Sequence, residues 1–113
     1  MSQSQQNICV EHGSEYLPPK DDQIVGVGLS TMMRKEPLHG LRHVLEAGTS
    51  GWYLWRGDYS EDESFFSPIC ASHIFDYAAE GVKFLGLAPG FRFLVSGDYE
   101  DVWFDPKLLE PNL

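Results

Sequence analysis

Two segments of the chain place carboxylates next to aromatic rings. In the first, Trp52, Tyr53 and Trp55 precede an acidic run at 58–63, and in the second Trp103 lies among the acids of 98–105. Carboxylates at such positions can act as general acids and bases, ligate metal ions or contact a basic partner. A general acid requires a carboxyl group held in an apolar pocket. Adjacent acids in a Ser- and Tyr-rich loop are typical of solvated side chains, which favours binding over catalysis.

One hydrolytic alternative uses the same acids. Glu61, Asp62 or Glu63 could form a glycosidase-type carboxylate pair with Asp98 or Asp101 if the fold brought them together. The order of residues in the acidic run does not fit an EF-hand loop, so calcium binding of that type is not predicted.

The other side chains that could bind metal or act as nucleophiles do not complete a known motif. His39 and His43 would share a helix face, but a zinc site needs a third ligand, and Gly40 weakens the helix. Cys70 and His73 form a weak nucleophile–base combination, and the chain has no Gly-x-Ser-x-Gly elbow. The sequence therefore predicts no metal, no cofactor and no catalytic residue.

Composition restricts the partners. The 113 residues carry a formal charge of −9, which disfavours nucleic acid and anionic membranes and suits a basic protein surface. No apolar run reaches the length of a membrane span and no export signal is recognisable, so we expect a cytoplasmic protein. Cys9 and Cys70 could be paired or free, and the sequence does not decide between the two.

Short elements must position these residues. Strands are predicted at 24–29, 52–55, 91–95 and 102–104, the last two as a hairpin that turns at Gly97. A helix capped by Ser72 should run to about Leu85, before Gly86. We expect a flexible tail at 1–7 and a single domain at 8–113. The predicted class is α+β, with a small antiparallel sheet packed against one main helix.

Strand alternation predicts which rings are available. Trp52 and Leu54 should face one side of the sheet, and Tyr53 and Trp55 the other. The same alternation separates Trp103 from its two neighbours. If helices cover only one side of the sheet, one set of rings is exposed beside the carboxylates, as in an interface hot spot.

Several segments resemble a known family. The segment 48–57, GTSGWYLWRG, is similar to a "GTSGWYIW-G" block of bacterial immunity protein 33 domains, and 59–68 resembles their "YSEDPDFFxP". The segments 85–94 and 99–105 are similar to "LGLPPGWRFL" and "YEDVWFD" of the same family. The resemblance extends over roughly residues 24–109.

The resemblance implies an immunity protein that binds and neutralises a cognate toxin of a polymorphic toxin system, without being an enzyme. It carries over no catalytic residue and does not identify the toxin or the oligomeric state. Together with the exposed rings and acids, it predicts partner-binding residues at Trp55, Asp58, Tyr59, Glu61, Asp62, Glu63, Tyr99, Glu100, Asp101 and Trp103. The alternatives are a small-ligand or regulatory binding domain with a pocket lined by the same rings, and a small hydrolase.

Overall fold

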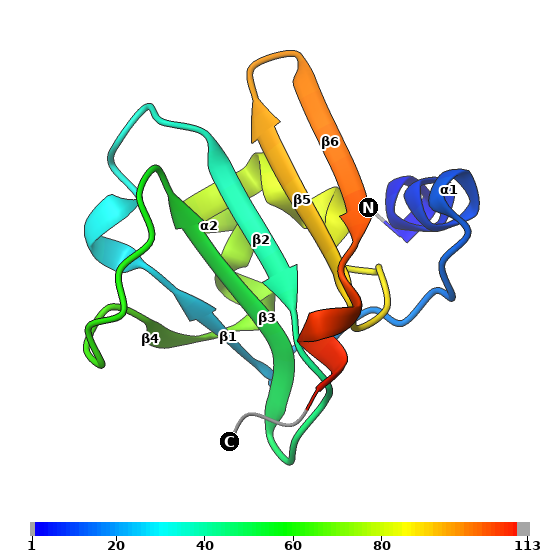
Figure 1. Ribbon diagram of the computed structural model, residues 1–113, viewed down its shortest axis with the longest axis horizontal. Coiled ribbons are helices and arrows are strands. Elements are labelled where there is room, and N and C mark those ends of the chain that lie inside the picture. Colours follow the sequence, from blue (N-terminus) through cyan, green and yellow to red (C-terminus); the bar gives the residue numbers. More distant parts are fainter. Residues whose placement is uncertain (1, 111–113) are drawn as a thin grey trace.

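A six-stranded mixed sheet organises the protein in the computed structural model, which describes residues 2–110 (Figure 1). The strands are β1 (Ile24–Val27), β2 (Leu38–Arg42), β3 (Thr49–Arg56), β4 (Ser67–Cys70), β5 (Phe91–Ser96) and β6 (Tyr99–Phe104). The helices are α1 (Ser2–His12) and α2 (Ile74–Ala78), with 3-10 segments η1 (Leu29–Thr31), η2 (Ala71–His73), η3 (Ala79–Phe84) and η4 (Pro106–Leu109).

The strand order is β4-β1-β3-β2-β5-β6. Only β1 and β3 pair in parallel, and the other four pairings are antiparallel. The α+β class predicted from the sequence is confirmed. The predicted small antiparallel sheet with one main helix is corrected to a larger mixed sheet, whose helical layer consists of several short segments.

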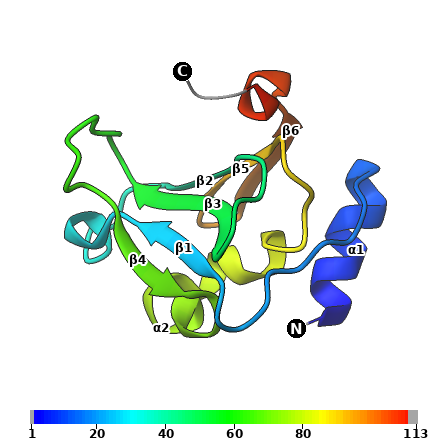
Figure 2. The same cartoon turned by 90° about the horizontal axis from the view of Figure 1, so that it is seen from below.

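The main helical layer, with α2 and η3, covers one face of the sheet, and the short η4 lies on the other side (Figure 2). Trp52 and Leu54 point into the core between the layers, together with Phe93, whose ring stacks on Phe84 at 4.4 Å. Tyr53 and Trp55 lie on the opposite face, as the alternation predicted. In the described part of the chain, that face carries only the loop 57–66 and the short η4 at its margins, and we call it the open face.

The hairpin of β5 and β6 is confirmed and is longer than predicted. Its register pairs Ser96 with Tyr99 around a two-residue turn, and Gly97 adopts a φ of +58° there. A two-residue hairpin turn with a positive φ at its first central residue favours glycine there, because glycine adopts this conformation without steric cost. The turn therefore fixes the register of the two strands.

The predicted helix at 72–85 is broken into three segments. Ser72 lies inside η2 and is not the N-cap, and Ala78, at φ −150° and ψ 67°, separates α2 from η3. Ile74 and Ala78 are buried, whereas Tyr77 is 40% exposed. Each of the two segments still buries apolar side chains, Ile74 and Ala78 in α2 and Val82 and Phe84 in η3.

Strands β2 and β4 are absent from the sequence prediction. Gly40 made β2 look like a loop, yet the glycine is required there by packing. A Cβ at this position would lie 2.1 Å from the ring of Phe93. The ring therefore crosses the strand directly at Gly40.

Helix α1 begins within the stretch for which the sequence predicted a flexible tail. The Gln5 side chain donates a hydrogen bond to the carbonyl of Val82 at 2.9 Å, and Ile8 and Cys9 are buried against the core. These contacts tie the helix to η3. Met1 lies outside the described residues, and the proposed domain boundaries stay a prediction.

One cation lies inside the core. Arg42 is 1% exposed, and its guanidinium donates to the carbonyls of Ser50 at 2.8 Å and of Leu17 and Leu87 at 2.6 Å. It also lies 5.6 Å from the centre of the Trp52 ring. Burial lowers the pKa of Arg42 to about 10, so the group remains charged at neutral pH. A single side chain therefore joins three segments that are distant in the sequence.

Candidate functional site

The open face is built from two rows of side chains that cross the central strands. Strand register places Tyr53, Leu41, Arg92 and Trp103 in one row. The second row consists of Trp55, His39, Leu94 and Asp101. Because neighbouring strands lie about 4.8 Å apart, each row runs roughly 14 Å from β3 to β6. The two ring-and-acid segments found in the sequence therefore meet on one surface.

The 57–66 loop folds back onto this surface next to β3. Tyr59 packs edge-on against Trp55, with ring centres 5.3 Å apart, and Phe66 packs against Tyr53 at 5.0 Å. The Tyr53 ring also lies over Gly26 of β1, where a Cβ would come within 2.6 Å of it. This packing covers the β1 side of the open face and holds the acidic loop in place.

Trp55 is not the exposed ring that the sequence predicted. It is only 4% exposed, because His39 stacks on it at 5.1 Å and Tyr59 covers it. Tyr59 is 56% exposed and Trp103 is 37% exposed. Tyr59 therefore presents the outer ring surface of this cluster, and Trp55 supports it from beneath.

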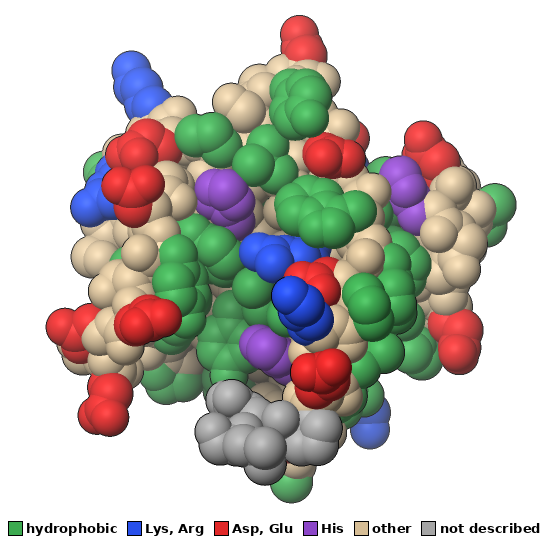
Figure 3. Space-filling view, viewed as in Figure 1, with side chains coloured by type: hydrophobic (Ala, Val, Ile, Leu, Met, Phe, Trp, Pro, Cys, Tyr) green, Lys and Arg blue, Asp and Glu red, His purple; other side chains and the backbone are tan. Residues whose placement is uncertain are grey.

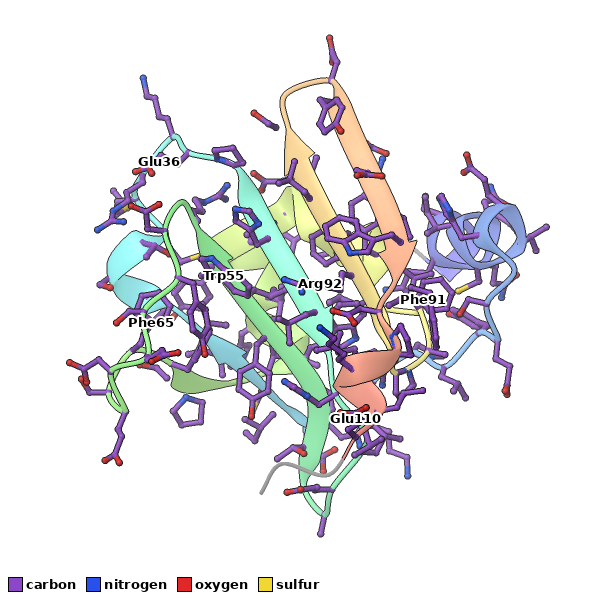
Figure 4. All side chains as sticks on the ribbon, in the orientation of Figure 1. Glu36, Trp55, Phe65, Phe91, Arg92 and Glu110 are labelled. Carbon is purple, nitrogen blue, oxygen red and sulfur yellow. The ribbon has the colours of Figure 1, made fainter. Side chains whose placement is uncertain are left out.

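A groove of about 1000 Å³ lies between the 57–66 loop and η4. Rings and apolar side chains form much of its lining, and the charged side chains that line it are Glu46, Arg92 and Glu110. Figure 4 shows Arg92 near the middle of the open face, and Glu110 beside η4. The groove is thus an aromatic concavity with acids at its end.

Arg92 is neutralised locally. Its Nη1 lies 3.2 Å from a carboxylate oxygen of Asp105, and its guanidinium lies 5.5 Å from the centre of the Trp103 ring. Its Nε is buried without a hydrogen-bond partner. The pair with Asp105 leaves the middle of the face close to neutral, so the unpaired acids dominate its charge.

His39 is held in its neutral form by its position in the row. Burial, followed by the nearby positive charge of Arg92, lowers the pKa of His39. The imidazole therefore stacks on Trp55 as an uncharged ring at neutral pH. His43 makes an edge-on contact with Tyr53 at 5.6 Å.

Most of the acids lie at the periphery of this view, around a centre of apolar, histidine and basic side chains (Figure 3). In the 57–66 loop, Asp58, Glu61, Asp62 and Glu63 are exposed. The backbone N–H and hydroxyl of Ser64 donate to Asp62, and these two bonds lower the pKa of its carboxyl group. A general acid needs the opposite shift, so Asp62 is unsuited to the hydrolase alternative.

Strand β6 divides its predicted site residues between the two faces. Asp101 and Trp103 lie on the open face, and the parity of the strand places Tyr99 with them. Glu100 lies on the helical side, where it forms an ion pair with Lys83 of η3. Glu100 is thus separated from the other predicted residues.

The histidines and cysteines singled out in the sequence form no metal site and no disulfide in the described part of the chain. His39 and His43 lie on or just after a strand instead of a helix, about 13 Å apart along the chain. Within residues 2–110, no three His, Cys, Asp or Glu side chains are grouped as metal ligands would be. Both cysteines are free thiols, Cys9 buried and Cys70 partly exposed. Helices long and apolar enough to cross a membrane are also absent from this part of the chain.

A family model of the Imm33-like domain matches residues 4–105. No curated protein and no solved structure matches the chain. Because the match covers most of the 113 residues, the chain belongs to the Imm33-like domain family. The resemblance found in the sequence is thereby confirmed.

Sequence reasoning missed the middle of the open face. Leu41, Arg92 and Leu94 lie there between the two predicted segments. His39 lies in the same part of the face, and His43 contacts Tyr53 beside it. The alternation of residues 91–95 places Arg92 on the other face of the sheet from Phe93, so its position on the open face could have been predicted. The position of β2 between β3 and β5 had no such signal, because it follows from long-range pairing.

Proposed function

We propose that the protein is an immunity protein that neutralises a cognate toxin by stoichiometric binding through the open face, without catalysis. Membership of the Imm33-like domain family supports the general role. The observation that carries the assignment to the open face is the joining of both ring-and-acid segments on it.

The surface has the chemistry that a basic protein partner requires. Tyr59 and Trp103 offer partly exposed rings, which are frequent anchors at interfaces. The acids around them attract Lys and Arg side chains over several ångströms and increase the rate of association. Asp58, Tyr59, Asp101 and Trp103 remain in the proposed interface, Trp55 supports Tyr59, and Glu100 lies outside it unless the partner reaches the sheet edge.

The binding experiment uses the cognate toxin, which a pull-down from the native host would identify. Neutralising Glu61, Asp62 and Glu63 together, with Gln, Asn and Gln, should lower the association rate about tenfold at low salt. The salt dependence of that rate should also become weaker, because long-range attraction is screened by ions. Surface plasmon resonance at several ionic strengths measures both effects.

A matched control changes the same number of charges in the helical layer. Glu11, Glu15 and Asp76 are exposed on or beside α1 and α2. Their neutralisation alters the net charge equally but should leave the association rate within about twofold. Equal effects of the two triple variants would remove the 57–66 loop from the interface, and absence of any complex would refute the proposed function.

The groove favours one second candidate, a small-ligand binding domain. Its lining of Tyr53, Tyr59 and Phe66 suits a flat aromatic compound. Such a ligand should raise the melting temperature of the purified protein at micromolar concentration, which a thermal-shift screen of aromatic compounds would detect.

A further inference from the structure

Strand β6 forms an edge of the sheet that is unusually open to pairing. All six of its residues pair with β5 in a regular register without a bulge. The opposite edge strand, β4, has only four residues and contains Pro68, which cannot donate to a neighbouring strand. Proteins protect edges by shortness, bulges, proline or charged side chains, and of these β6 uses only the charges of Glu100 and Asp101.

The free hydrogen-bonding groups of β6 can be assigned from its register. The N–H of Asp105 donates to the carbonyl of Gly90 at 2.7 Å, so these two residues form a hydrogen-bonded pair. In an antiparallel ladder, such pairs recur at every second residue. The backbone groups of Glu100, Val102 and Phe104 therefore point away from β5, toward the outside of the sheet.

The side chains around this edge are apolar rings and acids. Tyr99, Trp103 and Phe104 are 59%, 37% and 48% exposed. The segment 98–105 contains four acids and no Lys or Arg. Glu100 and Asp105 have ion-pair partners, in Lys83 and Arg92, whereas no ion pair is formed by Asp98 or Asp101 in the described structure.

These charges select the chemistry of a pairing strand. Two copies of the segment 98–105 side by side would bring together eight acids, four of which, Asp98 and Asp101 of each copy, form no ion pair in the described structure. Like charges opposite each other destabilise a pair of strands. A strand with basic side chains would have the opposite effect. The unpaired acids therefore disfavour a second copy and favour a basic segment.

We propose that β6 accepts an extended basic segment of the partner as a seventh strand of the sheet. Main-chain hydrogen bonds to Glu100, Val102 and Phe104 hold the segment. Its basic side chains face Asp101, and its apolar side chains contact Trp103, so the strand continues the open-face interface onto the edge. This inference rests on the proposed function, because the partner is the cognate toxin.

Hydrogen exchange tests the geometry directly in the complex with that toxin. In the free protein, the amides of Asp101 and Trp103 should exchange slowly because they bond to β5. The amides of Glu100, Val102 and Phe104 should exchange fast in the free protein and slow at least about tenfold in the complex. NMR detection resolves these five amides individually.

A proline substitution gives an independent test. Val102→Pro removes an N–H that β5 does not use, so the fold should tolerate it at an edge. The variant should bind the toxin at least about tenfold more weakly, because one main-chain bond is lost and the ring obstructs the incoming strand. Val102→Ala is the matched control, since it shortens the side chain but keeps the amide, and it should bind within about threefold of wild type.

The outcomes separate this inference from the function on which it depends. A wild-type complex in which the three outward amides exchange as in the free protein would overturn the edge strand and leave the immunity function standing. Equal affinities of Val102→Pro and Val102→Ala, with both variants folded by circular dichroism, would do the same. A wild-type protein that forms no complex would overturn both.

Discussion

Replacement of the buried Arg42 by Met should be among the most damaging single substitutions in this protein. Met retains most of the apolar stem but none of the donors. The carbonyls of Ser50 and Leu87 would then remain buried without a partner, and that of Leu17 would lose its bond. The loss concerns backbone groups from three segments at once, so no single local adjustment restores it.

The size of the effect follows from those contacts. Each buried carbonyl left unsatisfied costs about 1–3 kcal/mol, and loss of the cation above the Trp52 ring costs about 1 kcal/mol more. The substitution also removes a buried charge, and because burying the guanidinium is itself unfavourable, this offsets part of the loss in stability. We expect a net loss of about 2–4 kcal/mol in the free energy of unfolding, equivalent to a fall of roughly 8–16 °C in the melting temperature.

Urea denaturation followed by tryptophan fluorescence measures this loss, and Arg56→Met is the matched control. Arg56 forms two hydrogen bonds to Glu80, at 2.7 and 3.1 Å, but the Glu80 side chain is 45% exposed. Water can solvate that carboxylate when the arginine is gone, so we expect a loss of only about 1 kcal/mol or less. A result in which Arg42→Met is as stable as wild type, or no worse than the control, would refute the view that the buried cation holds the three segments together.

Two further predictions concern the sheet itself. Gly40→Ala should lower the free energy of unfolding by about 1–3 kcal/mol, because the added methyl group collides with the Phe93 ring. In a Phe93→Leu background the same substitution should lower it clearly less. Equal losses in both backgrounds would contradict the packing argument. Because the pKa of His39 is lowered in the folded protein, the unfolded chain binds a proton at this side chain more readily than the folded chain does. The free energy of unfolding should therefore fall as the pH drops from 6.5 through the pKa of the folded state. In denaturation experiments between pH 7 and 5, His39→Gln should weaken this pH dependence.

The parts of the fold that the sequence predicted depend on local patterns. Strand β3 and the β5–β6 hairpin alternate clearly, so the sides of Tyr53 and Trp103 could be assigned in advance. Strand β2 could not be recognised, because its core-facing positions include a glycine and an arginine. Gly40 is explained only by the ring of Phe93, and Arg42 only by carbonyls from distant segments.

The candidate site, like the fold, could be predicted only where local sequence patterns define it. Its two ends were visible as ring-and-acid segments, but their junction required the order of the strands. The burial of Trp55 could not be foreseen either, since it depends on His39 from one neighbouring strand and on the return of the 57–66 loop. Hydrophobic patterns report which side of a strand a residue occupies, but they do not report what covers it.

The strand order also has a consequence for how the chain reaches its native state. Strands β2 and β3 form one hairpin, and β5 and β6 form another. The pairing of β2 with β5 joins them across the segment that contains β4, η2, α2 and η3. Each hairpin closes a short loop, whereas their union closes a long one at a greater entropic cost. The slow event in folding should therefore be the meeting of two preassembled halves, and the acidic outermost strand arrives already bonded to its neighbour.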